Sequence, residues 1–177
     1  SAASDVYKRQ PPSKDFSKNY QSGPLSFEYF LDGIKIITNC GFGKDISPKV
    51  ELLSRLTASQ STMTINDTSI TKFERNMLIN NVFGNSIKNT FKVSDFKVKD
   101  EKNFTGCSIT HNGYEKNFSC IHKREIYLDH ENIKIKGVDH ILKKSDGIPI
   151  RYVFRFHLNP QLKACLLYTS DAADDDH

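Results

Sequence analysis

The chain has 177 residues, a formal net charge of +4 at pH 7, and 37% hydrophobic and 26% charged residues. This length allows one domain or two small ones, and the hydrophobic content is too high for a wholly disordered chain. No apolar run reaches the ~20 residues of a membrane-spanning helix, so the sequence predicts no transmembrane segment.

The two ends of the chain are predicted to be foreign to it. A DNA sequence that encodes residues 1–10 also encodes residues 165–173 when its reverse complement is read. Such an inverted repeat resembles a sequencing-library adapter, so we interpret residues 1–10 and 165–177 as adapter-derived artefacts. The remaining segment, residues 11–164, holds 23 basic and 16 acidic residues, a net charge of +7.

The first half of this segment reads as short strands joined by turns. Alternating apolar and polar residues predict strands, and Asp-Gly or Asn-Asp pairs predict turns. Residues 48–56 could form one helical turn or a loop. The expected elements are strands at residues 25–29, 34–38 and 62–65, with turns at Asp32-Gly33 and Asn66-Asp67.

The second half continues the pattern after a long insertion. Residues 68–103 are expected to be mostly loop, with a strand near residues 90–98. The later elements are strands at residues 104–111, 114–128 (broken or bulged near His122), 132–136 and 150–158, with turns at Asn112-Gly113 and Asp146-Gly147. Many short strands separated by turn signals predict an all-β fold, an antiparallel β-sandwich.

The residues alone show no catalytic or metal-binding motif. Cys40, Cys107 and Cys120 are too far apart for a Cys-x-x-Cys pair, and a Cys107–Cys120 bridge is possible but not required. No histidines are spaced as metal ligands on one strand or helix. The charge favours an anionic partner, but the lysines and arginines are dispersed and no nucleic-acid-binding motif is present, so we expect no nucleic acid partner.

Several short segments, taken in order over residues 20–160, resemble the C-terminal β-sandwich region of the heparinase II/III-like family of polysaccharide lyases. They are Leu25-Ser-Phe-Glu28, Asp32-Gly33, Ile37-Thr-Asn-Cys-Gly41, residues 56–68, His111-Asn-Gly-Tyr114, residues 121–128, Gly137-Val-Asp139 and Arg155-Phe-His-Leu-Asn-Pro160.

The resemblance implies a larger parent protein. Its N-terminal α/α-toroid would carry most of the β-elimination chemistry, including a Tyr general acid/base, on uronic-acid-containing anionic polysaccharide. The β-sandwich would close one side of the substrate groove. The family is typically exported, which implies the periplasm or cell envelope. We therefore expect no catalytic residue in this chain, and an inactive fragment of a lyase.

The chain departs from the family pattern at a structural zinc site. At the three zinc-ligand positions, where many members carry His or Asp, this sequence has Gln21, Asn39 and Gln60, and Asn19 stands where many members carry a His that can face the active site. Amides are poor zinc ligands, so we expect no metal and no cofactor. We predict instead that Gln21, Asn39 and Gln60 cluster and hydrogen-bond one another.

The predicted substrate-groove residues come from these segments. They are Gln21, Asn39, Gln60, Arg124, Arg155 and His157. Arg binds carboxylates with two parallel hydrogen bonds, although surface ion pairing is the simpler role for both arginines. For His111, His122 and His157, a role within the packed domain is favoured over one in the groove.

Three functions stay open. The first is the β-sandwich of a polysaccharide lyase, which would contact its own toroid and an anionic polysaccharide. The second is a non-catalytic module that binds anionic glycan or supports the cell envelope. The third is a β domain with only a packing role, which predicts no glycan affinity.

Overall fold

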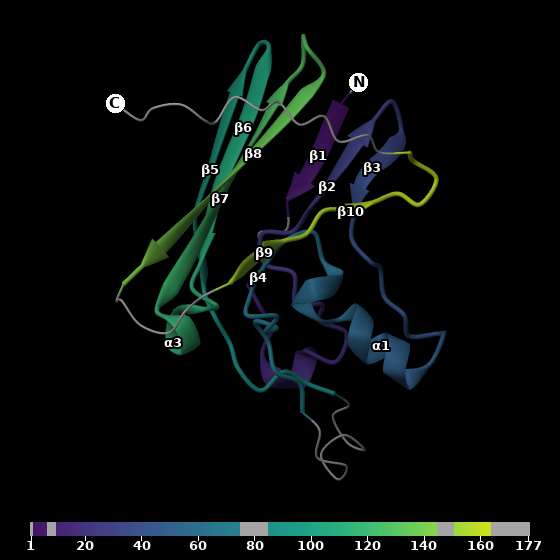
Figure 1. Cartoon of the computed structure of the whole chain (residues 1–177), viewed down its shortest axis with the longest axis vertical. Helices are drawn as coiled ribbons and strands as arrows, with labels where there is room; N and C mark the ends of the chain where they lie inside the picture. Colours follow the sequence, from purple (N-terminus) through teal and green to yellow (C-terminus); the bar gives the residue numbers. More distant parts are fainter. Residues whose placement is uncertain (1, 7–9, 75–84, 145–150, 164–177) are drawn as a thin grey trace, which may run out of the picture.

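A computed structural model describes residues 2–6, 10–74, 85–144 and 151–163 (Figure 1). Its strands form three sheets, and every strand pair is antiparallel in these residues. The strands are β1 (Ala2–Val6), β2 (Phe27–Leu31), β3 (Ile34–Thr38), β4 (Met63–Ile65), β5 (Val93–Glu101), β6 (Phe104–His111), β7 (Cys120–Asp129), β8 (Lys134–Lys143), β9 (Tyr152–Phe154) and β10 (His157–Leu158).

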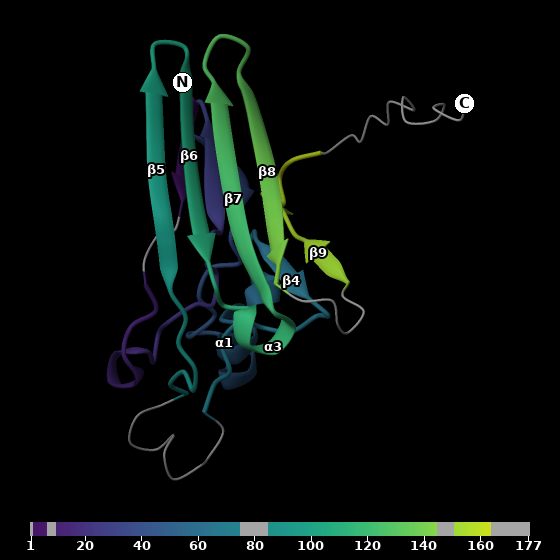
Figure 2. The same cartoon turned by 90° about the vertical axis from the view of Figure 1, so that its left-hand side faces the viewer.

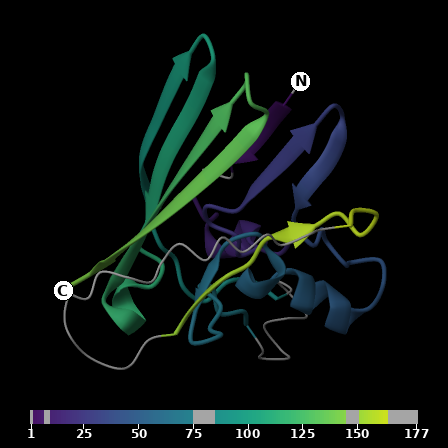
Figure 3. The same ribbon diagram turned by 45° about the horizontal axis from the view of Figure 1, so that its top comes forward.

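Two four-stranded sheets face each other, which confirms the predicted all-β fold. One has the order β1-β2-β3-β10, and the other is the meander β5-β6-β7-β8 (Figures 1 and 3). The pair β4-β9 lies at one end, together with the helices α1 (Pro48–Ser54) and α3 (Glu115–Phe118). Short 3-10 turns cover Lys14–Phe16 and Thr57–Ser59.

The predicted turns at Asp32-Gly33 and Asn66-Asp67 are confirmed. Asp32 and Gly33 have φ values of 48° and 79°, which are the positive values that a two-residue hairpin turn requires. Asn66 and Asp67 likewise have positive φ, and Ile65 bridges to Thr68 across them. Within residues 48–56, Pro48–Ser54 form α1, and the side chain of Ser47 accepts a hydrogen bond from the Val50 N–H as its N-cap.

The predicted hairpin at Asn112-Gly113 and the strand over residues 114–128 are wrong in detail. Strands β6 and β7 do pair, but α3 lies between them and β7 begins only at Cys120. The Asn112 side chain accepts from the Lys92 N–H and donates to Glu115, which fixes a wider connection. The expected break near His122 is also wrong, since β7 runs unbroken to Asp129.

The single last strand predicted for residues 150–158 is also wrong. The chain crosses between sheets there: β9 pairs with β4, and β10 pairs with β3. Phe154, Phe156 and Leu158 stay 38–48% exposed because the strand that would have buried one face is divided. The strand expected near residues 90–98 is β5, and the Asp146-Gly147 turn lies outside the described residues.

The core consists of two apolar clusters. One joins the two large sheets through Phe27 and Tyr29 of β2 and Ile126 and Leu128 of β7. The other surrounds Leu25, Met63, Ile65, Ile70, Phe91, Val93, Ile109, Tyr114 and Cys120. Between them, the alternating buried face of β7 carries the polar residues His122 and Arg124.

Strand β1 falls in the segment interpreted as adapter-derived. It pairs with β2 over residues 2–6 through backbone hydrogen bonds. Backbone pairing of this kind accepts many sequences, so it does not bear on the origin of the segment, and the proposed boundaries stay a prediction.

Candidate functional site

A small cavity contains the three amides predicted to cluster. Gln21, Asn39 and Gln60 line a hollow of about 200 Å³ together with Asn19, Tyr20, Gly23, Pro24 and Ser26. A Cβ on Gly23 would lie 2.8 Å from Gln60 Cγ, so glycine allows the Gln60 side chain to pack here. We call this hollow the amide cavity.

The three amides bond to the backbone, and no bond between two of them occurs in the described residues. Gln21 Nε2 donates to the Gly41 carbonyl at 2.7 Å, and buried Gln60 Nε2 donates to the Ser54 carbonyl at 2.9 Å. Asn39 Oδ1 accepts from the Ser61 N–H at 2.8 Å. The amides therefore shape the cavity and hold the loops around it.

Ser61, which the sequence analysis did not single out, joins three of the predicted residues. Its N–H donates to Asn39, its hydroxyl accepts from the His157 N–H at 2.9 Å, and its carbonyl accepts from Arg124 Nη1 at 2.9 Å. Ser61 is fully buried. No local sequence signal marks it, because the junction forms only when β3, β7 and β10 converge.

Arg124 is committed to partners inside the domain. Its side chain is 1% exposed, and Nε and Nη2 donate to the two carboxylate oxygens of Asp139 at 2.7 and 3.0 Å. The guanidinium also lies 5.6 Å from the Phe27 ring and 5.7 Å from the Phe156 ring. Arg124 therefore pairs with Asp139 of its own sheet in a buried position rather than in the expected surface ion pair, and its contact with a substrate carboxylate stays a prediction.

Two histidines extend the Arg124–Asp139 pair into a chain of hydrogen bonds. The Gly113 N–H donates to His111 Nδ1 at 3.0 Å, so His111 carries its proton on Nε2. His111 Nε2 then donates to His122 Nδ1 at 3.1 Å, and His122 Nε2 donates to Asp139 at 2.7 Å. Each imidazole has one donor and one acceptor, so both rings are neutral. We call His111, His122, Arg124 and Asp139 the inner network.

The pKa shifts agree with this assignment. Burial, and after it the neighbouring His122 and Arg124, hold the pKa of His111 well below its ordinary value. Burial also lowers the pKa of His122, although its bond to Asp139 opposes the effect. Burial alone would raise the pKa of Asp139, but the hydrogen bonds from His122 and Arg124 outweigh it and lower that pKa to about 2.

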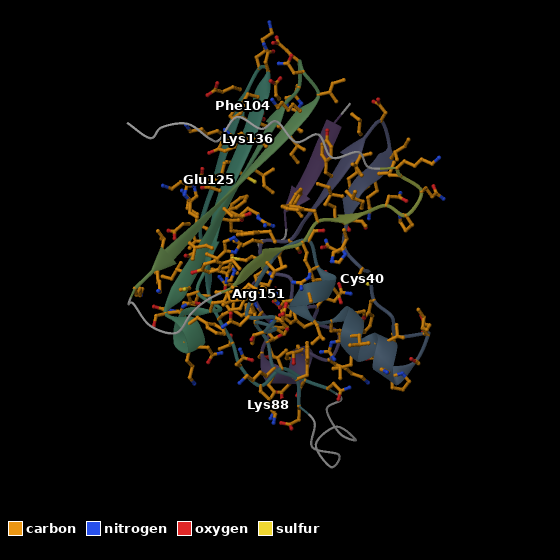
Figure 4. The ribbon with its side chains drawn as sticks, viewed as in Figure 1. Cys40, Lys88, Phe104, Glu125, Lys136 and Arg151 are labelled. Carbon is orange, nitrogen blue, oxygen red and sulfur yellow. The ribbon has the colours of Figure 1, made fainter. Side chains whose placement is uncertain are left out.

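His157 and Arg155 lie beside the inner network, nearer the surface. His157 Nε2 lies 3.1 Å from the Ala58 carbonyl and therefore donates to it. Arg155 donates to Thr64 Oγ1 at 2.5 Å and to Asp67 at 3.2 Å, and Arg151 also pairs with Asp67. Figure 4 labels Arg151, directly before β9, and Cys40, two residues after the end of β3.

Arg55 is a second buried arginine that sequence reasoning missed. It is fully buried, donates to the carbonyls of Tyr20 and Ser17, both at 2.9 Å, and lies 4.2 Å from the Phe73 ring. Burial lowers its pKa to about 10, against the opposing effect of Glu51. Arg55 therefore fixes the segment that leads into Gln21 and the amide cavity.

The part of the chain that the structure describes contains no candidate metal site and no disulfide bond. No group of three or more His, Cys, Asp or Glu side chains there could hold a metal ion. Cys40, Cys107 and Cys120 are free. Register explains why Cys107 and Cys120 do not meet: Cys107 lies opposite Ile126, while Cys120 lies opposite Lys143.

The outer face of the β5–β8 sheet also carries a hollow, which sequence reasoning treated only as a solvated basic surface. It measures about 710 Å³ and is lined mainly by β5, β6 and β7. Five of its lining residues are lysines: Lys92, Lys97, Lys99, Lys123 and Lys144. The period-two spacing of Lys97 and Lys99 on a strand could have indicated a common face.

Comparisons with known proteins identify a family. The family model described as heparinase II/III-like, C-terminal, matches residues 9–175. No curated protein and no solved structure matches the chain. The family match includes residues 165–175, so the interpretation of the two ends as adapter translation stays a prediction. No helix among the described residues is long and apolar enough to cross a membrane.

Proposed function

Because this chain belongs to the heparinase II/III-like family by its C-terminal domain, we propose that it forms the β-sandwich of a polysaccharide lyase. The parent protein would cleave uronic-acid-containing polysaccharide by β-elimination, with the general acid/base on a separate toroid. The family match over nearly the whole chain is the observation that carries this proposal. By the same family likeness, we propose the periplasm or cell envelope as its location.

The geometry of the described residues suits a supporting role. A β-elimination needs a base that removes the proton next to the uronate carboxylate, and a group that neutralises that carboxylate. His111 and His122 are buried and neutral, and Arg124 already holds Asp139. These groups stabilise the domain, so the proton transfer would fall to another part of the parent protein.

The amide cavity is the surface of this domain that we propose to lie against the substrate. Gln21 and Asn39 are half-buried at its mouth and offer uncharged donors and acceptors. His157 is joined to Asn39 through Ser61, and Arg155 lies two residues before His157 in the chain. Such groups could orient sugar hydroxyls without chemistry of their own.

One experiment separates the lyase from a non-catalytic glycan-binding module. The uninterrupted gene is recovered from the source DNA, and the complete protein and the present chain are assayed side by side on polyuronate. A lyase produces an unsaturated uronate that absorbs in the ultraviolet. We expect product from the complete protein and none from the chain alone.

Two results would count against the proposal. If the complete protein binds polyuronate but forms no unsaturated product, the non-catalytic module is favoured, and the neutral amides at the expected zinc positions would fit it. If residue 11 follows an unrelated domain in the gene, the lyase assignment falls.

A further inference from the structure

The outer face of the β5–β8 sheet is hollow for a reason visible in its register. Outward-facing residues form rows across the strands: Lys97, Ser108 and Glu125 are opposite one another, and so are Lys99, Gly106 and Tyr127. In each row the residue on β6 is small, while its neighbours on β5 and β7 are long. The floor on β6 is therefore low between two raised walls. We call this hollow of about 710 Å³ the outer groove.

The groove lies on the side of the sheet opposite the inner network. On β7 the buried residues alternate with the half-buried ones, and Lys123, Glu125 and Tyr127 belong to the outward set. Figure 2 looks onto this face, and Figure 4 shows Glu125 on the side away from β1–β3. The groove and the amide cavity share no lining residue.

The charges in the groove leave a positive surplus. Glu125 pairs with Lys123, and Glu115 pairs with Lys144, so the two glutamates are already compensated. Lys123 and Tyr127 are the main groups that lower the pKa of Glu125 to about 2. Within the described residues, no acidic side chain pairs with Lys97 and Lys99, which are exposed on β5, or with Lys92, which is exposed directly before it. Asp95 also lines the groove and accepts from the Ser94 hydroxyl, so five lysines stand against three carboxylates there.

Tyr127 lines one end of the groove, and Phe104 lies beside it, outside the lining. The rings of Phe104 and Tyr127 are stacked, with centroids 5.5 Å apart and planes at 23°. They cover Gly106, where a Cβ would lie 3.0 Å from Tyr127 Cδ1. An aromatic ring with a polar tip offers an apolar surface and a hydrogen-bonding group together. A sugar ring likewise has apolar C–H faces and a polar rim.

We propose that the outer groove binds an anionic polysaccharide chain, with the lysines of β5 facing its carboxylates or sulfates and the aromatic pair contacting a sugar ring. Lysine suits this ligand because it acts as a flexible point charge that adapts to charges repeated along a polymer. The proposal shares its ligand class with the proposed function but concerns a different surface and no bond cleavage.

Two alternative roles for these lysines predict different behaviour. The first alternative is that the lysines on β5, an edge strand, only prevent this strand from pairing with other chains. In that case, removing them would not alter glycan affinity. The groove could instead be covered by another domain of the parent protein, and its lysines would then be inaccessible in the complete protein.

The test measures equilibrium binding of the purified chain to alginate, a polyuronate, with neutral dextran as the control polymer. We compare the double variant Lys97→Ala/Lys99→Ala with Lys44→Ala/Lys49→Ala, which removes the same charge from exposed positions outside the groove. Exposed charge contacts are individually weak, so we expect roughly a fivefold loss for the groove variant and under twofold for the control.

A second variant removes space without removing charge. Ser108→Phe places a large side chain on the groove floor, at a strand position where aromatic residues are well accommodated. We expect it to weaken alginate binding at least as much as the double lysine variant, and binding to weaken for every variant as salt is raised. Circular dichroism and thermal unfolding confirm that each variant is folded.

Several outcomes would overturn the proposal. These are equal binding of dextran and alginate, equal losses in the two double lysine variants, unchanged binding by a folded Ser108→Phe variant, or protection of Lys97 and Lys99 from acetylation in the complete protein without glycan. The lyase proposal can fail independently. If alginate binds in the groove but the complete protein forms no unsaturated product, the lyase proposal falls and the groove proposal stands.

Discussion

On the inner face of the β5–β8 sheet, Arg124 meets Asp139 with two hydrogen bonds and is 1% exposed. On the outer face of the same sheet, Lys97 and Lys99 are exposed and face a hollow. Adjacent residues of β7, Lys123 and Arg124, lie on opposite faces of this sheet. The inner charges are compensated within the domain and stabilise it, whereas the outer surplus is available to a ligand.

The two faces should differ most in the loss of stability that follows when one charged side chain is removed from each. Arg124→Ala leaves the carbonyls of Leu25 and Ser61 without this donor and leaves Asp139 with His122 alone, so we expect a loss of about 3–5 kcal/mol in the free energy of unfolding. Lys123→Ala breaks a partly exposed ion pair and should cost less than about 1 kcal/mol. Urea denaturation measures both. Similar losses for the two variants would contradict the claim that the inner charges stabilise the domain more than the outer ones.

A second pair of variants compares packing. A Cβ at Gly113 would lie 2.5 Å from Cγ2 of buried Ile70 and 3.1 Å from His111 Nδ1, so Gly113→Ala should cost about 1–3 kcal/mol. A Cβ at Gly106 meets the Tyr127 ring, which can move toward solvent, and Gly106→Ala should cost less. Thermal unfolding of the two variants gives the order. The reverse order would show that the outer aromatic pair is held as rigidly as the core.

The pH dependence of stability should come from the inner face. His111 and His122 have folded-state pKa values below their ordinary values, so the unfolded chain binds more protons as the pH falls. Their contribution is complete above about pH 6.5 and declines below it. The carboxyl of Asp139, with its pKa lowered to about 2, adds a further loss at more acidic pH.

Denaturant unfolding at a series of pH values measures this decline. His140→Gln, which alters an exposed histidine on the outer face, should leave most of the decline in place. His122→Leu should reduce it. Equal stability of the wild-type chain at pH 7.5 and 5.5 would contradict the neutral assignment of the two buried rings.

The smallest effect on stability should come from the outer groove. Lys97→Ala/Lys99→Ala removes two exposed charges without a described acidic partner, and its free energy of unfolding should stay within about 0.5 kcal/mol of the wild type. The same variant should lose affinity for alginate. A large loss of stability would place these lysines among the structural residues instead.

Local sequence signals found several of the strands and the two tight turns at Asp32-Gly33 and Asn66-Asp67. Alternation and the Asp32-Gly33 and Asn66-Asp67 pairs predicted them, because both depend on neighbouring residues only. The connection between β6 and β7 was missed because Gly113 serves a close approach to Ile70, which lies far away in the sequence. The division of β9 from β10 was missed because it depends on two different partner strands.

The candidate site was only partly accessible from the sequence. The family likeness placed Gln21, Asn39 and Gln60 together, and the structure sets all three around one cavity. Their backbone partners, and the junction at Ser61, arise from residues distant along the chain. Arg124 carries a signal for carboxylate binding, but only the register that sets it opposite Asp139 shows which carboxylate it binds.

The most direct test of the difference between the two faces is lysine acetylation of the chain with and without alginate, read by mass spectrometry. Alginate should protect Lys92, Lys97 and Lys99 and leave Lys44 and Lys49 unprotected, while dextran protects none of them. Equal protection at all five lysines, or protection confined to Lys44 and Lys49, would show that the outer groove is not the glycan-binding surface.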